Sequence, residues 1–97
     1  MPPRILDIFR RANEPFWGKH RGIVMQNVDP LGVARLQVEV PGVLGPGRSV
    51  WALPLLPDGR LENYAPPQIG AKVWVEFEGG DPSRPIWTGF FWTNDIG

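Results

Sequence analysis

Cysteine is absent from this 97-residue chain, and histidine occurs once, as His20. Without cysteine the chain has no disulfides, no thiolate nucleophile and no cysteine-based zinc site. A Ser/His/Asp triad would have to use Ser49 or Ser83, and neither serine lies in a nucleophile-elbow motif. One histidine leaves only carboxylates as further metal ligands. We therefore expect no enzyme activity, no catalytic residues, no bound metal and no cofactor.

An excess of charge of either sign is also lacking, since ten Lys and Arg residues balance ten Asp and Glu residues. Neutralising nucleic-acid phosphates needs a clustered excess of basic side chains, so the balance favours protein partners. The glycine-rich segment Gly42–Gly47 lacks the Gly-Lys-Ser/Thr ending of a phosphate loop, which argues against nucleotide binding. We also expect no small-molecule substrate. A single-stranded nucleic-acid-binding module stays open as the alternative function, because aromatic side chains on a barrel face can stack bases.

Long apolar runs are the third absence. No stretch approaches the ~20 apolar residues of a membrane span, and the N-terminal sequence does not contain the apolar stretch of a signal peptide. We expect a soluble protein with no stable membrane insertion of this domain, and any export would need another route.

Glycine and proline, by contrast, are abundant, with twelve residues of each. The combined share of glycine and proline in the chain comes close to the roughly 25–30% at which low-complexity disorder is common. The chain is nevertheless 42% hydrophobic and has five Trp and five Phe residues, whereas disordered segments are poor in such side chains. Most of the Gly and Pro residues lie between runs of periodic apolar residues, so we expect them to mark the turns of one small domain.

A short helix is predicted near the N-terminus, where apolar residues from Ile5 to Ala12 share one face. Pro15 ends it, because proline cannot continue a helix. So short a helix does not persist alone in water, and its apolar face, which includes Phe9, should dock either on its own domain or on a neighbouring subunit. We expect residues 1–18 to form this helix and a linker, and residues 19–97 to form the main domain.

The remaining chain is typical of five short strands separated by turns. The clearest strand alternates Leu36, Val38 and Val40 with polar residues, so one face should be buried and the other solvated. The segments 41–47 and 54–70 are rich in Gly and Pro and are expected to be loops, the longer of which should cap or contact something. The predicted strands cover residues 22–28, 33–40, 49–53, 71–78 and 86–92.

This order of elements predicts an all-β fold. Five short strands, close hairpins and one long connection between the third and fourth strands favour a small five-stranded OB-fold barrel of the Greek-key type, preceded by the short N-terminal α-helix. An SH3-like barrel, which also uses five short strands, is the alternative architecture.

The register of the last hairpin decides which aromatic side chains share a face. If Glu78 pairs with Ile86, then Trp74 lies opposite Phe90 on the nominally polar face of the sheet, and Trp92 lies on that face too.

Five tryptophans are more than a core of this size requires, and tryptophan is enriched at the buried centres of protein interfaces. Trp51 and Trp87 are also compatible with a place in the core, whereas Trp74 and Trp92 are less well explained by folding alone. The candidate residues for a partner or subunit interface are Phe9, Trp51, Trp74, Phe90 and Trp92.

Two segments of the chain, Val40–Ala52 and Ile69–Phe90, resemble a known family. They resemble the OB-fold domain shared by phage baseplate assembly protein V, the central spike proteins of contractile phage tails and the VgrG spike proteins of type VI secretion. The likeness covers roughly residues 22–92, and its most specific part is the run EGGDPSRP between the last two strands. The matching residues that should shape the turns of this motif are Gly70, Gly79, Gly80, Asp81, Pro82, Pro85 and Gly89.

The resemblance implies a non-enzymatic structural protein, a homotrimeric collar between a tail hub protein and a membrane-piercing spike protein. It implies a place in the tail baseplate of a phage virion, assembled in the host cytoplasm, or in the equivalent baseplate of a bacterial injection machine. Larger members of the family continue into a β-helical spike, whereas this sequence ends at Gly97. Either the spike is a separate protein, or this is a stand-alone adaptor, or the sequence is a fragment of a longer protein.

Overall fold

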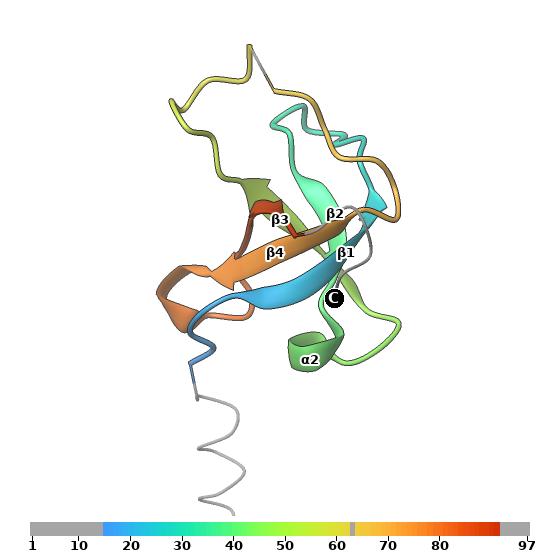
Figure 1. The fold of residues 1–97 in the computed structure, drawn as a ribbon, viewed down its shortest axis with the longest axis vertical. Coiled ribbons are helices and arrows are strands. Elements are labelled where there is room, and N and C mark those ends of the chain that lie inside the picture. The colour runs from blue at the N-terminus through green and yellow to red at the C-terminus, as the bar shows by residue number, and fades with distance from the viewer. Residues whose placement is uncertain (1–14, 63, 92–97) are drawn as a thin grey trace, which may run out of the picture.

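Five strands close into a barrel in the computed structural model, which describes residues 15–62 and 64–91 (Figure 1). The predicted N-terminal helix with Phe9, and the candidate interface residue Trp92, lie outside these described residues. The strands are β1 (His20–Gln26), β2 (Leu36–Glu39), β3 (Ser49–Pro54), β4 (Lys72–Phe77) and β5 (Pro85–Phe90).

The barrel has the strand order β1-β2-β3-β5-β4, and β4 closes it by pairing with β1. All pairs are antiparallel except β3 and β5, which run parallel where Leu53 lies beside Ile86. This crossover produces a five-stranded Greek-key barrel. The prediction of an all-β OB-fold barrel is therefore confirmed, and the SH3-like alternative is not needed.

The interior is filled by residues that alternate along the strands, as the period of two in the sequence predicts. Trp87, only 6% exposed, is the largest member of this core. Its burial agrees with the place in the core that the sequence allowed for this residue. The buried core residues are Val24, Leu36, Val38, Val40, Ala52, Val73, Val75, Phe77 and Trp87.

A one-turn helix, α2 (Pro41–Leu44), replaces part of the loop predicted over residues 41–47. Pro41 favours a helix start because its φ is already fixed near the helical value. The amide of Leu44 donates to the carbonyl of Val40 at 2.9 Å, and Val43 and Leu44 pack against the core. The prediction of a loop was wrong here because the partial burial of these two apolar side chains against the core outweighs the weak helix preference of this Gly- and Pro-rich segment.

The expected register of the last hairpin was also wrong. Trp74 lies opposite Gly89 rather than Phe90, and Glu76 rather than Glu78 lies opposite Ile86. The pairing shifts between Trp74 and Val75, where a bulge adds one residue to one of the two strands. Counting failed first at the turn, because Glu78–Gly80 forms a 3-10 turn and the strand pairing begins only at Phe77 and Pro85. The bulge then shifts the pairing by one residue.

The segment before β1 is attached to the β4–β5 hairpin, which contains the 3-10 turn η1 (Glu78–Gly80). The amide of Phe16 donates to the carbonyl of Gly80 at 2.8 Å, and the Phe16 ring lies 6.2 Å from that of Phe77. His20, at the start of β1, packs beside both rings, with its own ring 6.3 Å from that of Phe16 and 5.4 Å from that of Phe77. The chain therefore enters the barrel at a fixed place.

Candidate interaction surfaces

The β1–β2 loop, residues 27–35, is organised around one carboxylate. Both oxygens of Asp29 accept hydrogen bonds from the Arg35 guanidinium, at 3.1 Å from Nε and 2.8 Å from Nη2. The same carboxylate accepts from the backbone amides of Leu31, Val33 and Arg35. With five donors around it, the Asp29 side chain is only 3% exposed. The predicted strands 22–28 and 33–40 left a short turn between them, but the sequence gave no sign of the ion pair.

These donors change the acidity of the pair. The Arg35 side chain is the main cause that holds the pKa of Asp29 far below its usual range, and the three backbone amides add to the effect. Asp29 in turn raises the pKa of Arg35. The loop is therefore closed by a charge-assisted, two-point hydrogen bond, which is stronger and more directional than a single neutral one.

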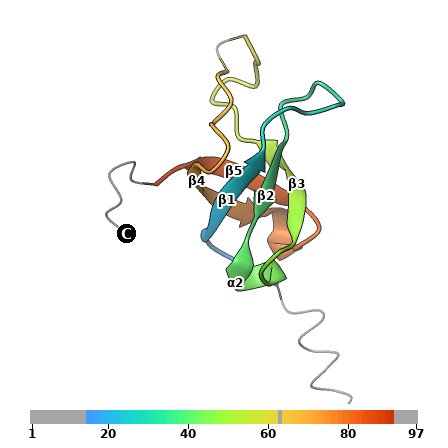
Figure 2. The ribbon, with the colours of Figure 1, turned by 90° about the vertical axis from the view of Figure 1, so that its right-hand side faces the viewer.

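Apolar side chains point outward from this closed loop. Leu31 is 69% exposed, and Val28 and Val33 are exposed too. A loop that is already ordered loses little conformational freedom when it binds, which favours affinity. Figure 2 shows that the loop projects from one end of the barrel, beside the β3–β4 connection and away from α2.

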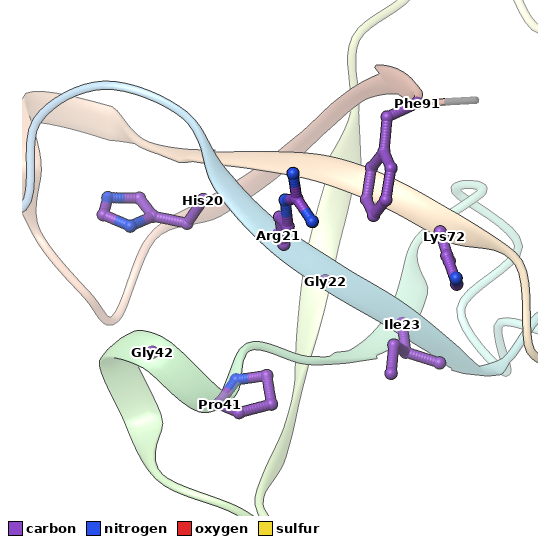
Figure 3. Close-up of a pocket in the computed structure, with 8 residues that line it drawn as sticks. All are labelled: His20, Arg21, Gly22, Ile23, Pro41, Gly42, Lys72 and Phe91. Carbon is purple, nitrogen blue, oxygen red and sulfur yellow. The ribbon is translucent and has the colours of Figure 1, made fainter. Parts of the chain in front are cut away.

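A groove of about 350 Å³ follows the outer side of β1 (Figure 3). It is lined by His20–Ile23 of β1, Pro41 and Gly42 of α2, Lys72 of β4 and Phe91. The groove exists because the pairing of β2 with β1 begins only at Ile23, after which β2 leads into α2. The charged residues in its lining are Arg21 and Lys72, both basic, and none of the lining residues is a carboxylate.

Trp74 lies beside this groove. Its ring is 4.8 Å from that of Phe91, and the Arg21 guanidinium lies over both rings, at 5.8 and 5.1 Å from their centres. Such cation–π stacking covers aromatic surface and fixes the arginine head group. The structure thus pairs Trp74 with Phe91, which the sequence did not single out, rather than with Phe90.

The other interface candidates lie elsewhere on the barrel. Trp51 is half-buried on β3 beneath the Arg35 guanidinium, 4.8 Å from its ring centre. Phe90 is exposed at the end of β5, and its ring meets that of Trp87 edge-on at 6.2 Å. The described candidates therefore do not form a single cluster.

A second hollow, of about 390 Å³, adjoins Trp51 and Leu53 on the face of β2 and β3. OB-folds that bind oligonucleotides use this strand 2–3 face together with the adjoining loops. The two arginines that line the hollow are paired with carboxylates: Arg35 with Asp29, and Arg84 with Glu78 and Asp81. This arrangement is not the basic channel that phosphate binding requires.

The motif residues of the β4–β5 hairpin have identifiable backbone roles. Gly79 and Gly80 both adopt positive φ, at 61° and 76°, as glycine does most readily. Asp81 Oδ1 accepts from the amide and the hydroxyl of Ser83, which forms an Asx-turn. These bonds from Ser83 lower the pKa of Asp81.

The remaining motif residues lie at the strand ends. Gly70 has φ +89° and donates its amide to the carbonyl of Val24 at 2.7 Å, which fastens the long connection to β1. Pro85 is buried at the first position of β5, where the loss of an amide donor costs least. Pro82 lies in the hairpin turn, and Gly89 lies opposite Trp74 next to the bulge.

Within residues 15–62 and 64–91, no group of three or more His, Asp and Glu side chains could hold a metal ion. No helix in the same part of the chain is long and apolar enough to cross a membrane.

Comparison with known proteins gives one positive result. A family model described as the type VI secretion system/phage-baseplate injector OB domain matches residues 20–92. The matched segment begins at the first residue of β1 and includes all five strands of the barrel. No curated protein sequence matched the chain.

Proposed function

Because the chain belongs to the family of type VI secretion system and phage-baseplate injector OB domains, we propose that it forms a homotrimeric collar in such a baseplate. The collar joins the tail hub protein to the central spike protein and has no enzymatic role. The observation that carries this proposal is the agreement between the matched residues, 20–92, and the closed barrel.

The hub contact is assigned to the end of the barrel that carries the β1–β2 loop. The loop presents Val28, Leu31 and Val33 on a backbone that Asp29 and Arg35 hold in place. Ordered apolar side chains surrounded by polar ones are typical of the centres of protein interfaces. The N-terminal helix with Phe9, predicted from the sequence, is proposed as the second hub-binding element.

Subunit packing is assigned to the aromatic residues on the sides of the barrel. Trp74 and Phe90 belong to this group, as does Trp92 from the sequence prediction, and Trp51 is the candidate on the β3 side. A ring of identical subunits uses two different patches on each copy, so aromatic residues on separate strands suit this arrangement better than one central cluster.

Co-expression with the hub protein of the same baseplate tests this function. We expect the two proteins to purify together through affinity and size-exclusion steps, and to separate when Leu31 is replaced by Ser. Leu53→Ser is the control, because Leu53 is also apolar and exposed but lies on β3, outside the β1–β2 loop. A hub protein that never purifies with the native chain would overturn the proposal.

Binding of single-stranded nucleic acid is the competing function. Titration of labelled oligonucleotides at rising salt distinguishes the two, because phosphate-driven binding weakens steeply with salt. We expect no binding at physiological ionic strength, and tight, salt-sensitive binding would favour the competitor.

A further inference from the structure

The groove along β1 combines apolar walls with basic charge. Ile23 is 39% exposed there, and Phe91 forms part of the same lining. Figure 3 shows Arg21 and Lys72 beside Phe91, with Pro41 on the opposite side of β1. A complementary segment would therefore carry an aliphatic side chain with carboxylates close to it.

The same chain presents a segment of this chemistry on the β3–β4 connection. Residues 55–62, here named the β3–β4 tip, include Leu61, which is 43% exposed. Asp58 and Glu62, both exposed, lie three residues before it and one residue after it. Together with Arg60 they give the segment 58–62 a net charge of −1 from two carboxylates and one guanidinium.

Local bonds hold the tip in place. The amide of Gly59 donates to the carbonyl of Leu56, and the amide of Arg60 donates to Asp58 Oδ1 at 3.0 Å. After the tip, the amide of Tyr64 donates to the carbonyl of Leu61 at 3.0 Å.

Tyr64 fastens this end of the connection to the barrel. Its ring lies 5.8 Å from that of Trp87, and its hydroxyl donates to the carbonyl of Ala34 at 3.5 Å. Burial against the core raises the pKa of the Tyr64 phenol. The tip is thus presented by an anchored backbone, so its binding would order few new residues.

A single copy cannot bring the two elements together. The tip projects from the end of the barrel that lies away from α2, whereas Pro41 and Gly42 of α2 form one wall of the groove (Figure 2). Each copy therefore offers one donor element and one acceptor element at separate places. Contacts of this head-to-tail kind close into rings when the rotation between copies permits it.

We propose that the β3–β4 tip of one copy docks in the β1 groove of a second copy, with Leu61 against Ile23 and Phe91. The carboxylates of Asp58 and Glu62 then face Arg21 and Lys72. The proposal rests on the homotrimeric collar proposed above, and it specifies which surfaces meet between subunits.

A disulfide trap tests this contact, since the chain has no cysteine of its own. The double variant Ile23→Cys/Leu61→Cys is oxidised mildly in the presence of the hub protein and separated without reductant. We expect covalent species up to a closed trimer, and peptide mass spectrometry should identify a disulfide that joins position 23 of one copy to position 61 of another. The control Leu53→Cys/Leu61→Cys moves one thiol to an exposed position outside the groove.

The rates of disulfide cross-linking decide whether the tip docks in the groove. Docking raises the local thiol concentration, so the groove pair should cross-link about tenfold faster than the control pair or more. Lys72→Glu in the groove variant should remove this advantage, and adding Glu62→Lys should restore it. Equal rates for the two thiol pairs would overturn the proposal.

The trap also separates this proposal from the proposed function. Co-purification with the hub as a trimer, without faster cross-linking, would refute the docking contact and leave the collar intact. A cross-linked ladder that continues past the trimer would support the contact and contradict a closed collar.

Discussion

Arg35 binds Asp29, six positions before it in the β1–β2 loop, through two hydrogen bonds, of 3.1 Å from Nε and 2.8 Å from Nη2. The same guanidinium lies 4.8 Å from the ring centre of Trp51. One arginine thus ties the β1–β2 loop to the outer face of β3. This connection holds the exposed apolar side chains of the loop in a fixed position relative to the barrel.

Asp29→Asn should weaken hub binding more than it weakens the barrel. The amide cannot accept hydrogen bonds on both sides, so the two-point pairing with Arg35 is lost and the loop gains freedom. We expect hub affinity to fall about tenfold, measured by calorimetry, with an unchanged far-UV spectrum. Asp81→Asn, which changes a carboxylate in the β4–β5 hairpin that also accepts a hydrogen bond from a backbone amide, should bind normally. Full affinity in Asp29→Asn would show that the loop needs no such support.

Acid should destabilise the fold through the same carboxylate. The folded state lowers the pKa of Asp29 below its unfolded value of about 3.9, so ionised Asp29 stabilises the fold above that pH. This contribution is lost as the pH falls below about 4, toward the lower pKa of the folded state. Thermal unfolding followed between about pH 7 and pH 2 should show a decline that is shallower in Asp29→Asn. Identical profiles would show that Asp29 is not a source of the acid sensitivity.

Gly80→Ala should destabilise the protein more than Gly79→Ala. Both positions have positive φ, which costs a residue with a side chain roughly 1–2 kcal/mol. At Gly80 an added Cβ would also lie 2.6 Å from Pro15 Cβ, whereas nothing lies within 4 Å at Gly79. Urea unfolding of the two variants measures the difference. Equal losses would show that the segment around Pro15 moves away at no cost.

The two tryptophans that bracket the bulge should behave differently. Trp87→Ala removes a buried core side chain and should cost about 3–5 kcal/mol of unfolding free energy. Trp74→Ala removes the stacking on Phe91 and Arg21 and should cost about 1 kcal/mol, while weakening self-association. Chemical unfolding and light scattering distinguish the two effects. A loss of several kcal/mol in Trp74→Ala with partner binding intact would make Trp74 a core residue instead.

Periodicity in the sequence was enough to predict the strands, because alternation of buried and exposed residues is what a barrel wall requires. Leu36, Val38 and Val40 illustrate this, since all three are fully buried. Two features escaped the same reasoning. The bulge at Trp74 changes the register without changing the composition, and α2 forms because Val43 and Leu44 find space against the core.

The candidate surfaces were predictable only in part. Composition pointed correctly to aromatic side chains outside the core, such as Trp74. The closure of the β1–β2 loop depends on the distance between Asp29 and Arg35 in space, and residues six apart in a turn have no periodic relation to reveal it. The groove depends on where β2 leaves β1, which is a property of the closed barrel rather than of any one segment.

The mass of the complex formed with the hub protein tests the collar most directly. Light scattering during size exclusion of the co-expressed proteins should give the mass of a complex that contains three copies of this chain. Addition of the spike protein should increase the mass of this complex. A chain that elutes apart from the hub as a monomer, or a complex with a single copy per assembled hub, would contradict the account.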